Sequence, residues 1–151
     1  MNKSEFIYVV YIRTTPKKLW VALTNSKIIE KYWFGLQIDT DWKVGSPWKF
    51  YYDNSIMDSG KILESIPQTR LVRSWQCQWK PNLKAEGISR CIYELTPAGK
   101  SVKLTITHTM KRPKSKFIEA VSEGWPMCIS NLKSLLETGK VALAEHPGHE
   151  A

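Results

Sequence analysis

The sequence has little of what marks secreted, membrane-spanning or zinc-binding proteins. It contains three cysteines among 151 residues, an odd number without CxxC or CxxH spacing, so neither a disulfide framework nor a zinc site is expected. The longest apolar run, at residues 7–12, is far shorter than the roughly 20 residues of a membrane-spanning helix. The N-terminal MNKSEFIY lacks the apolar stretch of a signal peptide. We therefore expect a cytoplasmic protein with no membrane partner.

Acidic residues are the scarcer charge, with 14 Asp and Glu against 22 Lys and Arg and a formal net charge of +8. Such an excess can indicate a polyanionic partner. However, the basic residues are spread from Lys3 to Lys140, and the one dense cluster, KRPKSK at residues 111–116, contains Pro113 and is typical of a solvated loop. The distribution does not favour nucleic acid as a partner.

The remaining composition is that of one globular domain. Apolar residues make up 42% and charged residues 24%, which is far from the signature of disorder. A chain of this length can bury about two thirds of the surface that its unfolded form exposes. We predict a single domain at residues 1–139. The following KVALAEHPGHEA, residues 140–151, offers little to pack and is predicted to be a flexible tail.

The N-terminal third predicts one strand followed by two short helices. Residues 5–13 are rich in β-branched and aromatic side chains, which favours a strand. Thr15 as N-cap and Pro16 at the first helical position predict a helix over PKKLWVALT. Asn25 or Ser26 is positioned to cap a second helix over KIIEKYW.

From residue 48 onward the hydrophobic period changes to two, which indicates strands. Trp48, Phe50 and Tyr52 alternate with other residues before a turn at residues 53–55. Further strand segments, separated by turn residues, cover 60–66, 70–79, 88–96 and 101–110. The helical period returns over residues 117–138 and ends at Gly139, giving the longest helix. These patterns predict an α+β fold with an antiparallel meander and a long C-terminal helix.

Five segments of the chain, taken in order, resemble a known family. They are TPKKLWVALTNSKIIEKYWFG, DWKVGSPWKFYY, GKILESIPQTRLVRSW, YELTPAGKSVKLTITHTM and GWPMCISNLKSLLETG. Over about residues 6–138 the chain is similar to the activator-of-heat-shock-ATPase homologue family of the START-like, birch-pollen-allergen-like helix-grip (SRPBCC) superfamily. The resemblance implies a curved six- to seven-stranded antiparallel sheet and a long helix enclosing a pocket. Superfamily members include lipid and hormone carriers, polyketide cyclases, aromatases and a co-chaperone domain, so the fold leaves the function open.

Strand alternation identifies the side chains that we expect to face the pocket. In residues 101–110, His108 shares parity with the apolar Val102 and therefore points inward. A hairpin that pairs Leu95 with Val102 would place Ser89 opposite His108. The predicted site depends on this register.

A polar row of Cys77, Ser89 and His108 would then cross the sheet. Adjacent strands lie about 4.8 Å apart, so Cys77 and His108 would be too far apart to share a zinc ion. Nucleophilic catalysis by Ser89 and His108 would need an orienting acid, for which Glu64 is the candidate if it faces inward. The simpler interpretation is that Ser89 and His108 hydrogen-bond each other or a buried water.

Aromatic richness is the most informative signal in the sequence. Seven tryptophans exceed what a core of this size needs, and their flat faces suit planar or aliphatic ligands. The alternative is that these rings fill a closed core without a vacancy. The candidate ligand-binding residues are Trp33, Trp48, Phe50, Glu64, Trp75, Cys77, Ser89, Tyr93, His108, Val121, Trp125 and Cys128.

We predict that the cavity binds a small hydrophobic or aromatic molecule of the lipid, polyketide or flavonoid kind, without a cofactor or metal ion. One alternative is a cofactor-independent cyclase or aromatase with His108 as its acid–base residue, although no recognisable catalytic constellation is present. The other, implied by the resemblance, is a co-chaperone that stimulates the ATPase of a heat-shock chaperone.

Overall fold

A seven-stranded antiparallel sheet forms the framework of the computed structural model, which describes residues 2–147. Its strands are β1 (Ser4–Ile12), β2 (Gln37–Asp39), β3 (Pro47–Tyr52), β4 (Ser55–Ile66), β5 (Arg70–Cys77), β6 (Ser89–Ala98) and β7 (Ser101–Met110). Its helices are α1 (Pro16–Thr24), α2 (Ser26–Tyr32), α3 (Pro81–Lys84) and α4 (Lys116–Thr138). The predicted α+β helix-grip fold is confirmed, and only the short β2 and α3 had no sequence signal.

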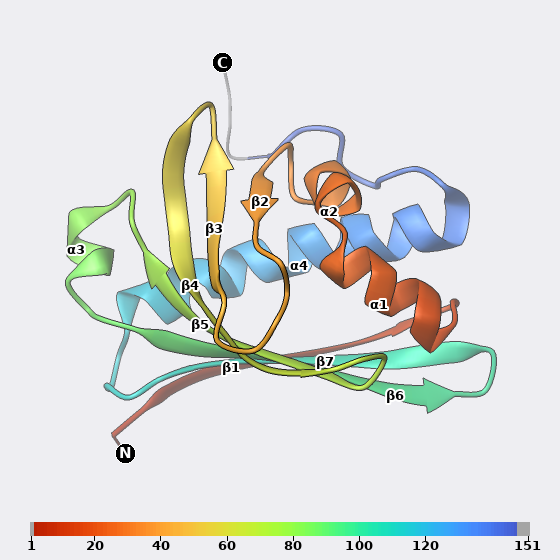
Figure 1. The fold of residues 1–151 in the computed structure, drawn as a ribbon, viewed down its shortest axis with the longest axis horizontal. Helices are drawn as coiled ribbons and strands as arrows, with labels where there is room; N and C mark the ends of the chain where they lie inside the picture. Colours follow the sequence, from red (N-terminus) through yellow and green to blue (C-terminus); the bar gives the residue numbers. More distant parts are fainter. Residues whose placement is uncertain (1, 148–151) are drawn as a thin grey trace.

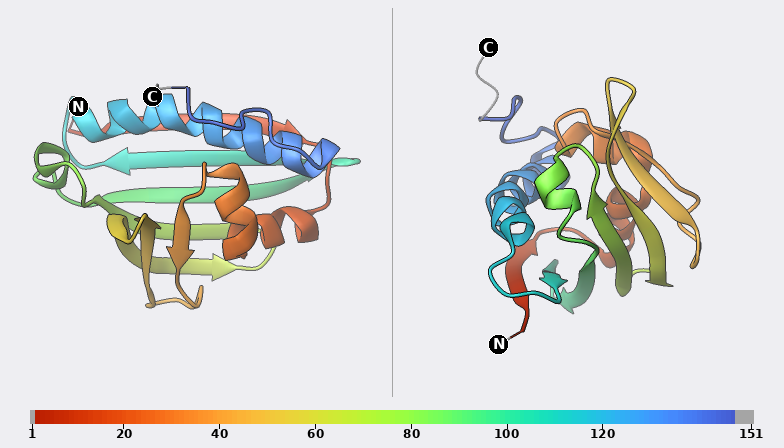
Figure 2. Two further views of the ribbon diagram at one scale, coloured as in Figure 1. Left: turned by 90° about the horizontal axis from the view of Figure 1, so that it is seen from above. Right: turned by 90° about the vertical axis from the view of Figure 1, so that its left-hand side faces the viewer.

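The strands lie in the order β1-β7-β6-β5-β4-β3-β2, so β1 and β2 are the two edges of the sheet. The sheet curves strongly, and α4 runs along it on the inner side, in contact with β1, β7 and α2 (Figures 1 and 2). Of the two short helices that follow β1, α2 contacts α4, and α1 packs against α2 and β6 (Figure 1). The core lies between α4 and the concave face of the sheet.

Side-chain caps begin the helices as the sequence predicts. Thr15 Oγ1 accepts a hydrogen bond from the Lys18 amide, and Asn25 Oδ1 accepts one from the Ile28 amide, each at 3.1 Å. At the start of α4 the Glu86 carboxylate accepts hydrogen bonds from the amides of Lys116 and Phe117, at 2.9 and 3.2 Å. These amides would otherwise lack an intrahelical partner, so Glu86 fixes the N-terminus of α4 to the segment between α3 and β6.

The β3–β4 hairpin has a tighter turn than the sequence pattern indicated. Asp53 and Asn54 both adopt positive φ, 50° and 65°, as a two-residue hairpin turn requires. The second strand of the hairpin therefore starts at Ser55, five positions before the predicted strand at residues 60–66. This extension brings Asp58, which lies between the predicted turn and the predicted strand, into the sheet.

A bulge in β4 overturns the prediction that Glu64 faces the pocket. Ile62 pairs with Arg73 and Glu64 pairs with Val72, so Leu63 is an extra residue without a counterpart on β5. The bulge moves Glu64 to the outer face, where its carboxylate forms ion pairs with the guanidinium groups of Arg70 and Arg90 at 3.3 and 3.1 Å. Glu64 therefore cannot orient His108.

The register of the β6–β7 hairpin differs from the prediction by two residues. Val102 pairs with Pro97 rather than Leu95, because β6 continues to Ala98 and the turn contains only Gly99 and Lys100. A shift by an even number of residues leaves each side chain on its predicted face. His108 consequently points inward as predicted, although its direct partner is Cys91 rather than Ser89.

The segment after α4 packs more than its composition indicated. Gly139 ends the helix in the left-handed conformation with φ 84°. The buried Asn131 then binds Leu143 twice, because its Nδ2 donates to the Leu143 carbonyl at 3.0 Å and its Oδ1 accepts from the Leu143 amide at 2.6 Å. Val141 packs against the core. The segment thus makes specific contacts at Val141 and Leu143, although most of residues 140–147 are exposed, and residues 148–151 lie outside the described residues.

Gly60 on β4 lies directly against the backbone of β5. A Cβ atom at this position would overlap the Ser74 carbonyl oxygen, which accepts a hydrogen bond from Trp48 Nε1 at 2.9 Å. Because a backbone group cannot move aside, we predict that Gly60→Ala lowers the free energy of unfolding by about 3 kcal/mol, measured by urea denaturation.

Gly124→Ala in α4 is the matched control, because a Cβ atom there meets nothing within 4 Å. This substitution should raise the free energy of unfolding by about 0.5–1 kcal/mol through the better helix propensity of alanine. Wild-type stability of the Gly60→Ala variant would contradict the assigned close approach.

Candidate ligand-binding site

The predicted aromatic wall packs largely on itself. Ring centroids of Trp33 and Trp125 lie 5.2 Å apart, those of Trp33 and Phe50 5.1 Å apart, and those of Trp48 and Trp75 5.0 Å apart. Their tilted and edge-to-face geometries are favourable for aromatic pairs. Trp48 and Phe50 are fully buried, so this part of the interior is a filled core.

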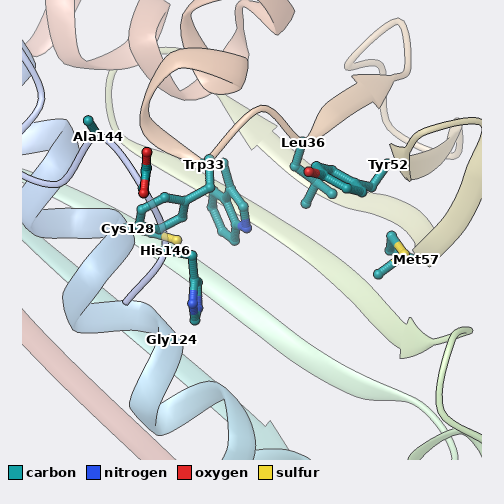
Figure 3. A pocket seen from close by; sticks show the side chains of 10 residues that line it. Trp33, Leu36, Tyr52, Met57, Gly124, Cys128, Ala144 and His146 are labelled. Atoms are coloured by element: carbon teal, nitrogen blue, oxygen red, sulfur yellow. The ribbon is translucent and has the colours of Figure 1, made fainter. Parts of the chain in front are cut away.

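Open space lies beside Trp33, at the rim of this aromatic cluster. A cavity of about 480 Å³, here called the outer cavity, separates α4 and the C-terminal segment from the β3–β4 hairpin. Figure 3 shows Trp33 between Cys128, Gly124 and His146 on one side and Leu36, Tyr52 and Met57 on the other. Its lining residues are Trp33, Phe34, Leu36, Tyr52, Met57, Gly124, Cys128, Ala144, Glu145 and His146.

A smaller inner cavity of about 190 Å³ lies between α4 and the segment from β5 to α3. Three residues, Trp33, Gly124 and Cys128, line both cavities. The inner cavity is lined by Trp33, Asp58, Trp75, Cys77, Trp79, Leu83, Phe117, Ala120, Val121, Gly124, Trp125 and Cys128.

A sharp turn after α2 directs two aromatic residues toward the outer cavity. Trp33 is the C-cap of α2, and its amide donates to the Ile29 carbonyl at 2.9 Å. Phe34 then adopts φ 54°, a left-handed conformation that is rare for a bulky residue, and Gly35 follows with φ 83°. The Phe34 ring lies edge-on to His146 with the centroids 5.1 Å apart. Through this ring contact the α2–β2 connection packs against the segment that follows α4, residues 140–147.

The structure divides the predicted site residues into two groups. Trp33, Trp75, Cys77, Val121, Trp125 and Cys128 line one or both cavities. Trp48, Phe50, Ser89, Tyr93 and His108 are buried and line neither cavity, and Glu64 is on the outer face. Sequence reasoning missed Asp58, Arg73 and the lining residues of the α2–β2 connection and the C-terminal segment. For Arg73 the signal was present, because it shares strand parity with the inward-facing Trp75.

His108 takes part in a chain of buried hydrogen bonds rather than in a cavity. Trp125 Nε1 donates to His108 Nδ1 at 3.2 Å, so Nδ1 is unprotonated and the proton of the neutral ring is on Nε2. His108 Nε2 is 2.8 Å from Ser89 Oγ, which in turn donates to the Trp75 carbonyl at 3.1 Å. The predicted hydrogen bond between Ser89 and His108 is confirmed. Burial, and to a lesser extent the charge of Arg73, lowers the pKa of His108 to about 3, so the ring is neutral at physiological pH.

Arg73 is a buried cation enclosed by aromatic rings. Its side chain is 2% exposed, and its Cζ lies 4.6 Å from the ring centroids of both Trp48 and Trp75. Nη2 donates to the Tyr93 hydroxyl at 3.2 Å, whereas Nε has no hydrogen-bond partner among residues 2–147. The aromatic faces are thus the main compensation for the lost hydration of this guanidinium.

Asp58 brings a carboxylate to the wall of the inner cavity. Its Oδ1 accepts a hydrogen bond from Trp75 Nε1 at 3.0 Å. Burial raises the pKa of Asp58 to about 6, against the lowering effects of the Trp75 hydrogen bond and the Arg73 charge. A carboxyl group with this pKa in a cavity is a candidate functional group.

The part of the chain that the structure describes contains no group of three His, Cys, Asp or Glu side chains placed to hold a metal ion. Within the same residues, no helix is long and apolar enough to cross a membrane.

A curved antiparallel sheet with a long helix along its concave face defines the helix-grip fold. Residues 13–137 match the model of the family described as "Activator of Hsp90 ATPase homolog 1-like protein". The chain belongs to this family, which confirms the resemblance seen in the sequence.

Solved structures from several organisms share the fold. A Mesorhizobium loti protein is 23% identical with a TM-score of 0.78, covering 91% of this chain and all of that one. A Cytophaga hutchinsonii protein is 28% identical with a TM-score of 0.73, covering 92% and 97%. CalU16 from Micromonospora echinospora is 20% identical with a TM-score of 0.71, covering 89% and 77%. No curated protein matches the chain.

The buried neutral His108 predicts a specific pH dependence of stability. The unfolded chain binds a proton at this histidine near pH 6.5, whereas the folded protein does so only near pH 3. Protonation therefore favours the unfolded state, and His108 lowers the free energy of unfolding by up to about 1.4 kcal/mol for each pH unit below 6.5. Urea denaturation of the wild type and of His108→Gln between pH 7 and 5 measures the difference, because glutamine can donate to Ser89 and accept from Trp125.

The quantity to compare is the pH dependence of the free energy of unfolding in the wild type and in His108→Gln. The comparison is needed because Asp58 changes stability in the opposite direction between pH 7 and 5. Its folded-state pKa is raised, so its contribution to stability increases as the pH falls. Identical pH dependence of wild type and His108→Gln would contradict the neutral, inaccessible histidine.

Arg73 should favour the ionised form of Asp58, and this coupling can be measured. We predict that Arg73→Met raises the pKa of Asp58 above its value of about 6, because the substitution removes a positive charge that favours the carboxylate. Titration of the side-chain carboxyl ¹³C signal by NMR reports the shift. Arg90→Met on the outer face is the control, and an equal shift in this variant would refute a specific effect of Arg73.

Proposed function

We propose that this protein binds a small hydrophobic or aromatic molecule in the outer cavity and the adjoining inner cavity. The observation that carries the proposal is the outer cavity itself. Its volume of about 480 Å³ falls within the roughly 300–1,000 Å³ of small-molecule sites. Aromatic and aliphatic side chains form most of its lining, and the polar groups are concentrated in Glu145 and His146.

The physical basis of binding is burial of apolar ligand surface, at about 25 cal/mol per Å² removed from water. Trp33 lines both cavities, and the flat face of its indole suits an aromatic ligand. Gly124 lines both cavities without a side chain, so it narrows neither of them.

Similar structures support more than one role for this fold. One is DynU16, described as a protein of the dynemicin biosynthetic locus, and another is an Hsp90 activator from Plasmodium falciparum, at 17% and 20% identity. At these identities the likeness concerns the fold alone, so the choice between these roles rests on the cavities and the residues that line them. The cyclase alternative relied on His108, which is buried behind Trp125 and lines neither cavity. Stimulation of a chaperone ATPase remains an alternative that the family description favours.

A side chain introduced at Gly124 should block binding without affecting the fold. The substitution Gly124→Leu fills space that lines both cavities, so we predict at least about a tenfold loss of affinity for the uncharged fluorescent probe N-phenyl-1-naphthylamine. The enhancement of probe fluorescence on titration with protein is the measurement.

Ser130→Leu is the matched control, because it adds the same side chain to an exposed position of the same helix. This variant should bind the probe like the wild type. Equal affinity of Gly124→Leu and wild type would show that the probe binds elsewhere, and no saturable binding to the wild type would refute the proposed function.

A further inference from the structure

The charged residues that line the two cavities are acidic, whereas the protein as a whole is basic. The chain carries 22 Lys and Arg against 14 Asp and Glu, yet within residues 2–147 no lysine or arginine lines either cavity. Both charged lining residues are acidic, with Asp58 in the inner cavity and Glu145 in the outer one. A bound ligand therefore meets carboxylates and aromatic faces, although the protein as a whole is basic.

The Asp58 carboxylate is held in position without a direct ion pair. Trp75 Nε1 donates to Oδ1 at 3.0 Å, and among residues 2–147 this is the one hydrogen bond formed by the carboxylate. The face of the same indole carries the Arg73 guanidinium, with Cζ 4.6 Å from the ring centroid. Trp75 thus fixes one oxygen of Asp58, and Oδ2 remains for a group inside the cavity.

The remaining surface of the inner cavity suits the apolar body of a cation. Five of its lining residues are aromatic, namely Trp33, Trp75, Trp79, Phe117 and Trp125. Aromatic faces attract a positive charge. Trp75, Phe117 and Trp125 are buried, whereas Trp79 is exposed at the edge of the cavity. An ammonium group beside a carboxylate forms charge-assisted hydrogen bonds, which are stronger than those between neutral groups.

We propose that the inner cavity selects an aromatic amine that is protonated at neutral pH, with its ammonium group at the Asp58 carboxylate and its ring system against the tryptophans. This inference rests on the proposed function and adds the charge of the ligand. A neutral or anionic molecule of the same shape gains the apolar contacts but places no cation in direct contact with the Asp58 carboxylate, which Arg73 influences only across Trp75.

Titratable groups from two elements surround Asp58. Arg73 and Cys77 approach it from β5, and Cys128 lines the same cavity from α4. Burial raises the pKa of both thiols, that of Cys128 to about 12, so both stay neutral near pH 7. Among these groups Asp58 alone changes charge between pH 5 and 8. Because the amine stays protonated over this range, its affinity should fall as the pH decreases through about 6.

Two probes of nearly identical shape test the inference. They are 1-naphthylmethylamine, which is cationic at neutral pH, and 1-naphthylmethanol, which is uncharged. We expect the amine to bind the wild type about tenfold more tightly than the alcohol at pH 7.5, and this preference to shrink at pH 5. Affinities are measured by NMR chemical-shift titration, and the shifted amides locate the probe.

Asp58→Asn is the decisive variant, because its side-chain oxygen can still accept from Trp75 while the charge is lost. It should bind amine and alcohol equally, with the affinity for the alcohol unchanged. Glu145→Gln in the outer cavity is the matched control and should keep the preference for the amine.

The possible results separate this inference from the proposed function. A preference for the amine that disappears in Asp58→Asn supports both. Equal binding of the two probes to the wild type, or a preference that persists in Asp58→Asn, overturns the inference and leaves the proposed function in place. If neither probe binds, the inference is overturned, and the titration with N-phenyl-1-naphthylamine decides the proposed function independently.

Discussion

The chain of hydrogen bonds from Trp125 to the Trp75 carbonyl is the contact around which the interior is arranged. It joins α4 to β7, β6 and β5 through His108 and Ser89, and these strands are neighbours in the sheet. Hydrogen bonds fix direction and distance in a way that apolar contacts do not. The position of Trp125 thereby sets how closely α4 approaches the sheet, and with it the space left for the inner cavity.

Arg73 adds a second constraint to the same interior. An unpaired cation in a core costs free energy unless the surrounding groups compensate it. Here Trp48 and Trp75 lie against its guanidinium, and Trp75 also binds Asp58. One indole therefore contacts a buried cation and a half-buried carboxyl group, and the two opposite charges influence each other across it. Arg73 and Asp58 thus place one positive and one negative group next to Trp75 in an otherwise largely apolar interior.

Most of the fold was predictable because period and caps are local properties of the sequence. Thr15 and Asn25 cap their helices as expected, and strand parity placed His108 correctly even though the hairpin register was wrong by two residues. The bulge at Leu63 was not predictable, because one extra residue leaves no trace in a short alternating pattern. Such a bulge moves every later side chain of the strand to the opposite face, here that of Glu64.

The candidate site was harder to predict than the fold, because its walls come from segments without hydrophobic period. Asn131, a polar residue in the middle of an amphipathic helix, is what attaches the C-terminal segment to the body of the protein. Residues 144–146 form one wall of the outer cavity immediately after this attachment. A bulky group attached directly to this segment would therefore be held within a few residues of the cavity wall, so the cavity shares its border with a part of the chain that lies outside the sheet and the long helix.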